Sequence, residues 1–121
     1  MSENSTWRET VEKELTVAHH AWREGSAGMG RVASRRAAGF AVRALVEAKQ
    51  LEGYGTNLMH HLGALADSEG APIGVRESAH RLAARKIPSE GFVMPFERGK
   101  TTPMDDVENI TQWVITALAE A

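Results

Sequence analysis

The chain has 121 residues, of which 42% are hydrophobic and 25% charged, and its net charge is −2. This composition is ordinary for one globular domain spanning residues 1–121, and it excludes global disorder and a second hydrophobic core. The acidic balance disfavours nucleic-acid binding over the whole surface but leaves room for a local basic patch. Because there is no cysteine, disulfides, thiol catalysis and cysteine-bound zinc are excluded.

The first expected helix covers residues 6–24. Thr6 and Glu9 have the spacing of a capping box at a helix N-terminus. Apolar residues then recur every three or four positions, at Trp7, Val11, Leu15, Ala18 and Trp22. This spacing predicts one apolar stripe, and Gly25 is a natural stop for the helix.

A second helix is expected over residues 31–51, after a turn at residues 25–30. Its apolar positions are mostly small residues: Val32, Ala33, Ala37, Phe40, Ala41, Ala44, Leu45 and Ala48. Small side chains let a neighbouring helix approach closely. Gly39 costs about 1 kcal/mol of helix stability relative to alanine, so we expect a close helix crossing there as compensation. This helix should be the most central one.

The remaining elements are two shorter helices, a loop and a final helix. A helix over residues 57–67 should face inward through Leu58, Met59, Leu62 and Leu65. Another should begin at Pro72 and end before Ile87. Residues 88–101 hold glycine and proline breakers and predict a loop that covers one end of the bundle, with a short hairpin as the alternative. Thr102 should cap the last helix, with Pro103 at its first position.

These elements predict an all-α, up-and-down bundle of four to five helices, in which short loops make successive helices antiparallel. The polar N-terminal residues do not resemble a signal peptide, and no run of about 18 apolar residues predicts a membrane span. We therefore expect a cytoplasmic protein without membrane contact.

Arginines of the second helix are one set of candidate functional residues. Their spacing forms two stripes beside the apolar face, at Arg31, Arg35, Arg36 and Arg43. Such a surface suits contact with phosphate groups. The alternative is an ordinary solvated face whose arginines pair with acidic neighbours such as Glu47.

Arg76 and His80 are a second candidate set, because residues four apart share a helix face. A histidine that moves a proton beside an arginine that stabilises negative charge suits phosphodiester cleavage. A third hypothesis is a metal site formed by His20, His61 and His80, which requires that their helices converge. The alternative is that these histidines are exposed or hydrogen-bonded, and no cofactor is expected.

The order of features resembles that of the HEPN (higher eukaryotes and prokaryotes nucleotide-binding) bundles. The resemblance covers roughly residues 15–118 and rests on the alanine-rich stretch at 33–46, followed by a short helix bearing His61-Leu62 and then Leu65. It implies a homodimer with a groove between subunits. Ribonucleases of that family carry an arginine, four to six residues and a histidine. Only three residues separate Arg76 from His80, which implies a non-catalytic or divergent member.

The favoured interpretation is an HEPN-like binding module, with a non-enzymatic role favoured. It would be a dimer that contacts a nucleotide, RNA or a partner protein through Arg35, Arg36, Arg76 and His80. Three alternatives remain open. They are a structural or assembly domain with no small ligand, a divergent metal-independent ribonuclease, and a histidine-based metal-binding bundle.

Overall fold

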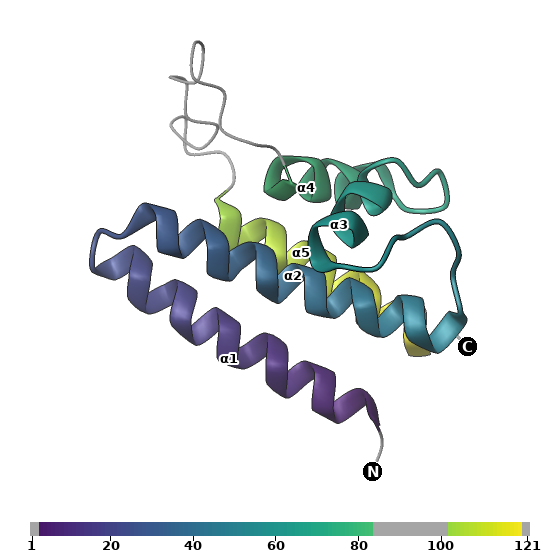
Figure 1. Ribbon diagram of the computed structural model, residues 1–121, viewed down its shortest axis with the longest axis horizontal. Helices are drawn as coiled ribbons and strands as arrows, with labels where there is room; N and C mark the ends of the chain where they lie inside the picture. Colours follow the sequence, from purple (N-terminus) through teal and green to yellow (C-terminus); the bar gives the residue numbers. More distant parts are fainter. Residues whose placement is uncertain (1–2, 84–101, 120–121) are drawn as a thin grey trace.

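The computed structural model describes residues 3–83 and 102–119. Five helices occupy these ranges: α1 (Glu3–Arg23), α2 (Ala27–Lys49), α3 (Leu58–Ala66), α4 (Ile73–Ala83) and α5 (Pro103–Ala119). No strand occurs in the described ranges, so the predicted all-α bundle is confirmed (Figure 1). None of these helices is long and apolar enough to cross a membrane. The loop expected at 88–101 lies outside the described residues.

Helix α2 is the centre of the bundle, as its small residues predicted. It packs against α1, α3 and α5 and makes a smaller contact with α4, which packs mainly on α3 and α5. Figure 1 shows α1 running antiparallel to α2 and α5 running beside α2 in the same direction. A hydrogen bond from Ser34 Oγ to Met104 Sδ (3.7 Å) joins the N-terminal parts of α2 and α5. Along the chain, the short helices α3 and α4 lie between α2 and α5, and they bring the chain back towards the N-terminal end of α2 (Figure 1).

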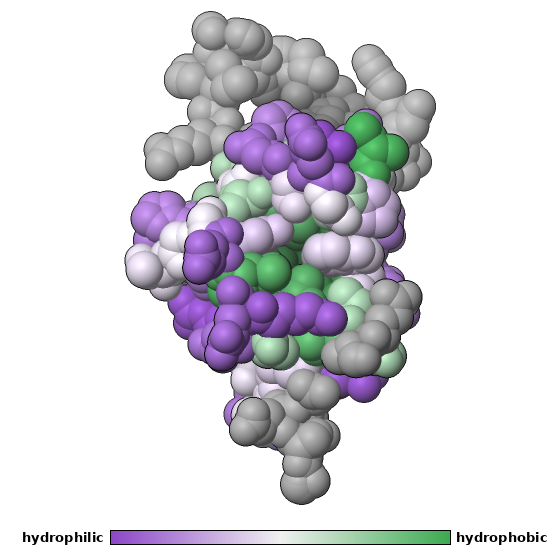
Figure 2. Space-filling view, turned by 90° about the vertical axis from the view of Figure 1, so that its right-hand side faces the viewer, coloured by the Kyte–Doolittle hydropathy of each residue, from purple (hydrophilic) through white to green (hydrophobic). Residues whose placement is uncertain are grey.

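The core draws residues from every helix. Its α2 contribution combines small, almost fully buried alanines with two larger residues, at Ala33, Ala37, Ala38, Ala41, Val42 and Leu45. The bulk comes from α3, α4 and α5, through Leu62, Leu65, Val75, Leu82, Val107, Ile110 and Val114. At the right-hand end of the bundle, Figure 2 shows hydrophobic atoms at the bottom of a hollow that hydrophilic side chains border.

The predicted close crossing at Gly39 is confirmed. A Cβ added to Gly39 would lie 2.7 Å from Cβ of Leu58 at the start of α3, closer than side chains can pack. Gly30 is a second close approach that the sequence did not predict. A Cβ there would lie 2.5 Å from Cε2 of Trp22, so the indole of α1 lies directly on the α2 backbone.

Two helix starts differ from their predictions, and one is confirmed. Helix α1 begins at Glu3, so Thr6 is not its cap. Instead, the Thr6 carbonyl accepts a hydrogen bond from Thr10 Oγ1 (3.2 Å). Helix α2 begins at Ala27 rather than Arg31, and Gly30, in its early part, lies against the Trp22 ring. The cap of α5 is confirmed: Thr102 Oγ1 accepts from the amide of Asp105 (3.1 Å).

Two large apolar residues expected to face inward are exposed instead. They are Val32 on α2 and Met59 on α3. Val32 lies on the side of α2 that carries Arg36, where the described part of the chain leaves the helix largely uncovered. The apolar residues of α2 occupy a wider part of the helix surface than the neighbouring helices cover.

Candidate functional site

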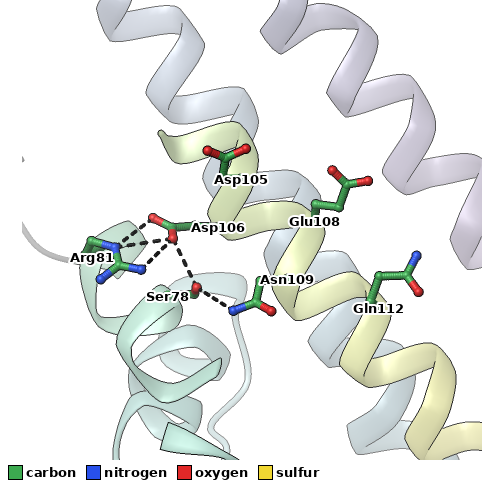
Figure 3. Close-up of a pocket in the computed structure, with 7 residues that line it drawn as sticks. All are labelled: Ser78, Arg81, Asp105, Asp106, Glu108, Asn109 and Gln112. Carbon is green, nitrogen blue, oxygen red and sulfur yellow. Dashed lines mark hydrogen bonds and ion pairs between the residues drawn. The ribbon is translucent and has the colours of Figure 1, made fainter. Parts of the chain in front are cut away.

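Helices α4 and α5 are joined by a buried carboxylate, that of Asp106. Its side chain is 5% exposed and receives a forked ion pair from Arg81. Arg81 Nε lies 3.1 and 3.2 Å from the two oxygens, and Nη2 lies 2.8 Å from Oδ1. Ser78 Oγ donates a further hydrogen bond to Oδ1 (3.0 Å). Figure 3 shows these side chains converging from the two helices.

The network continues to Asn109, whose Nδ2 donates to Ser78 Oγ (3.1 Å) and to the carbonyl of Gly74 (3.3 Å). The hydrogen bond with Asp106 raises the pKa of Arg81 above the ordinary range of arginine, although burial acts in the opposite direction. The charges of this pair therefore neutralise each other. We interpret the network as a clamp that fixes α4 on α5.

An open pocket of about 410 Å³ lies beside this clamp (Figure 3). Its lining comes from α4 and α5 and consists of Ser78, Arg81, Asp105, Asp106, Glu108, Asn109 and Gln112. Once Arg81 is paired with Asp106, two carboxylates remain, those of Asp105 and Glu108. The pocket is therefore acidic and unsuited to a phosphate ligand.

A different arrangement lies on the uncovered side of α2. Arg36, Phe40 and Arg43 occupy positions i, i+4 and i+7, so they share one helix face. The guanidinium carbon of Arg36 lies 5.6 Å from the centroid of the Phe40 ring, and that of Arg43 lies 6.0 Å from it. We call these three residues the arginine face of α2.

Arg36 is the more exposed of the two arginines, with 51% of its side chain accessible. Its Nε pairs with Oε2 of Glu14 on α1 at 3.2 Å, an exposed contact of the kind worth about 0–1 kcal/mol. Its two terminal nitrogens make no hydrogen bond to any residue that the structure describes. Arg36 can therefore offer N–H donors to a ligand without breaking a strong interaction.

Arg43 is held more firmly. Its Nε donates to Nε2 of His61 (3.3 Å) and its Nη2 donates to the carbonyl of Thr56 (3.2 Å). The sequence placed Arg43 on an arginine stripe but did not select it as a site residue. Its spacing of three from Phe40 and seven from Arg36 was the signal that could have selected it.

The four predicted binding residues do not form one groove. Arg35 points to α4, where its Nε donates to the carbonyl of Leu82 (2.7 Å), whereas Arg36 pairs with α1. Adjacent helix positions point about 100° apart, which explains the divergence. Arg76 is half-buried and its Nε has no hydrogen-bond partner, while His80 is exposed. Among the described residues, no hydrogen bond joins Arg76 to His80.

The three histidines of the metal hypothesis do not converge either. His20 is exposed on α1 and His80 is exposed on α4. His61 is buried, and its two ring nitrogens already contact Arg43 and the carbonyl of Tyr54 (2.8 Å). In residues 3–83 and 102–119, no three His, Asp or Glu side chains are placed to hold a metal ion. The hypothesised site of His20, His61 and His80 therefore does not form.

Comparison with protein-family models, curated proteins and solved structures finds no match to this chain. The resemblance to HEPN bundles therefore rests on the sequence features alone. The geometry of the described residues is the remaining guide to function, and it favours the arginine face of α2.

Proposed function

We propose that this chain is an HEPN-like helical binding module whose ligand is RNA or a nucleotide, bound through the arginine face of α2. The observation that carries the proposal is the placement of two guanidinium groups against one phenylalanine ring on a partly exposed helix face. The proposal places the module in the cytoplasm, where such ligands are available, and retains the homodimer as its assembly.

The arrangement suits a phosphate-bearing ligand for two physical reasons. Stacking on a ring holds a guanidinium flat and leaves its N–H groups in the plane, where they can bind a phosphate by two parallel hydrogen bonds. The outer face of a stacked guanidinium can also receive an unstacked base of single-stranded RNA. Arg36 and Arg43 are separated by about 10 Å along the helix axis, so they can contact different phosphates of one strand.

A structural or assembly domain is the second candidate function. It is supported by three exposed hydrophobic side chains on the α1–α2 hairpin, Val17, Met29 and Val32. Exposed apolar side chains that gather on one surface are typical of protein contacts. In this alternative, a second copy or a partner protein would cover the hairpin and no small ligand would bind.

Binding of a labelled single-stranded RNA oligonucleotide, followed by fluorescence anisotropy between about 50 and 200 mM salt, separates the two candidates. Arg36→Gln should weaken binding roughly tenfold, the effect of one lost charge-assisted hydrogen bond. It should also reduce the slope of log Kd against log salt by about 0.7, the value for one phosphate contact to a single strand. Arg36→Lys, which keeps the charge but not the planar fork, should recover the slope and only part of the affinity.

Arg23→Gln is the matched control, because Arg23 is an exposed arginine in the last turn of α1, away from the arginine face. Its replacement removes the same charge and should leave affinity nearly unchanged. Equal losses in the two variants would mean that RNA responds only to net charge. If RNA does not bind at low salt and native mass spectrometry shows a ligand-free dimer, the assembly role replaces the proposal.

A further inference from the structure

The segment 50–57, which joins α2 to α3, has little backbone bonding of its own. Gln50, Gly53 and Gly55 all have positive φ angles, of 53°, 85° and 72°. The backbone bond at its start runs from the Leu51 amide to the Val46 carbonyl (3.1 Å). At its end, Asn57 caps α3 by accepting from the amide of His60 (2.8 Å). Between these points, side chains hold the segment in place.

Two side chains from neighbouring helices provide this attachment. His61 Nδ1 lies 2.8 Å from the Tyr54 carbonyl, and Arg43 Nη2 lies 3.2 Å from the Thr56 carbonyl. The two side chains are joined to each other, because Arg43 Nε lies 3.3 Å from His61 Nε2. The three hydrogen bonds form a continuous series that runs from α2, through α3, to segment 50–57.

The hydrogen-bond donors in this series determine which ring nitrogen of His61 carries the proton. Arginine Nε can only donate, so His61 Nε2 must accept the hydrogen bond from Arg43. The ring proton is then on Nδ1, which donates to the Tyr54 carbonyl. The observed geometry thus requires a neutral imidazole in one tautomer.

We propose that Arg43 and His61 form a pH-sensitive latch on segment 50–57. A proton bound at His61 Nε2 would place an N–H group of one cation against the Nε–H of another, so the hydrogen bond would be replaced by repulsion. His61 is 3% exposed, and water therefore cannot screen the two charges well. Arg43 then withdraws from both His61 and the Thr56 carbonyl, and the segment is released.

Among the described residues, no acidic side chain forms an ion pair with His61, and none of the hydrogen bonds of α4, which packs on α3, reaches its ring. Arg43 is the charged group that faces it from α2. Tyr54, in the segment, contacts the ring through its carbonyl, and His60, beside it on α3, is exposed. Ion pairs in the described ranges join Arg36 to Glu14 and Arg81 to Asp106, so no carboxylate there pairs with His61.

The latch can be tested by NMR measurements of hydrogen exchange at single amides of the full chain, at about pH 7.5 and about pH 5.5. A histidine in water changes charge within this range. After correction for intrinsic exchange, protection of the Leu51 and His61 amides should fall roughly tenfold at the lower pH. The core amides of Ile110 and Val114 in α5 should keep their protection, since none of the three hydrogen bonds of the latch involves α5. This outcome does not depend on any ligand.

Two variants assign the effect to the Arg43–His61 contact. Arg43→Gln replaces the cation by an amide whose oxygen can accept from the protonated ring, so the pH dependence should disappear. His60→Gln removes the exposed neighbouring histidine and should leave the tenfold change intact. Circular dichroism at both pH values establishes that each variant is folded. Equal protection of the wild type at both pH values, or an unchanged pH response in Arg43→Gln, would overturn the proposal.

Discussion

Replacement of Asp106 by asparagine tests the clamp between α4 and α5. The substitution keeps the size of the side chain and one oxygen that can accept from Ser78. It removes the negative charge and places an amide N–H₂ group at the position of Oδ2, opposite Arg81 Nε, where both groups donate. The forked ion pair is therefore lost and Arg81 remains without its counter-charge.

The magnitude of the effect follows from the burial of the two partners. Removal of one partner from a buried ion pair costs about 3–5 kcal/mol. The side chain of Arg81 is 34% exposed, so water solvates the unpaired guanidinium and part of the attraction is already screened. After this discount we expect a loss of about 2–3 kcal/mol in the free energy of unfolding.

Urea unfolding followed by tryptophan fluorescence measures this loss. With a urea slope of about 1–3 kcal/mol per molar, the midpoint should fall by about 1–2 M. Asp105→Asn is the matched control, because Asp105 is the preceding residue of the same helix but is exposed. Its replacement should cost less than about 1 kcal/mol, the usual effect of a charge near a helix N-terminus. If the two variants lose equal stability, the clamp does not stabilise the fold as argued.

The other predictions concern pH, helix packing and capping. Because the hydrogen bond raises the pKa of Arg81, the clamp's contribution is complete below the ordinary pKa of arginine and is lost only as pH rises through the raised pKa. Unfolding in urea should therefore show no loss from this pair between about pH 7 and 10. Gly39→Ala should destabilise the protein by about 1–2 kcal/mol, because the added Cβ clashes with Leu58. Gly63→Ala, where a Cβ meets nothing within 4 Å, should stabilise α3 by about 0.5–1 kcal/mol. Urea midpoints measure both effects. Thr102→Ala should lower the thermal midpoint through a loss of about 1 kcal/mol, and serine at that position should restore it.

Much of the fold could be predicted from local sequence signals. Apolar spacing located all five helices, Thr102-Pro103 located the start of α5, and the small residues around Gly39 indicated a close crossing. The start of α2 could not be found this way. Residues 25–30, with three glycines, indicated a turn, whereas in the structure Gly28 and Gly30 belong to α2 and Gly30 lies against Trp22 of α1.

The candidate site was only partly predictable. The sequence placed Arg36 on an arginine stripe and Phe40 among the core positions, and Phe40 does pack against the core. The contacts of Arg36 and Arg43 with the Phe40 ring were not inferred from the spacing. Arg35 looked equivalent to Arg36 in the sequence, and only the positions of α1 and α4 separate their roles. The partner of Arg81 could not be inferred, because it lies 25 residues away on another helix.

The binding role of the arginine face can be tested most directly by observing the Nε–H signals of the arginines in an NMR titration with a short single-stranded RNA at low salt. Arg36 and Arg43 should shift together as RNA is added, because their guanidiniums are the proposed contacts. The Arg81 signal should stay in place, since its guanidinium is already bound to Asp106. Shifts at Arg81 with none at Arg36 and Arg43 would contradict the account.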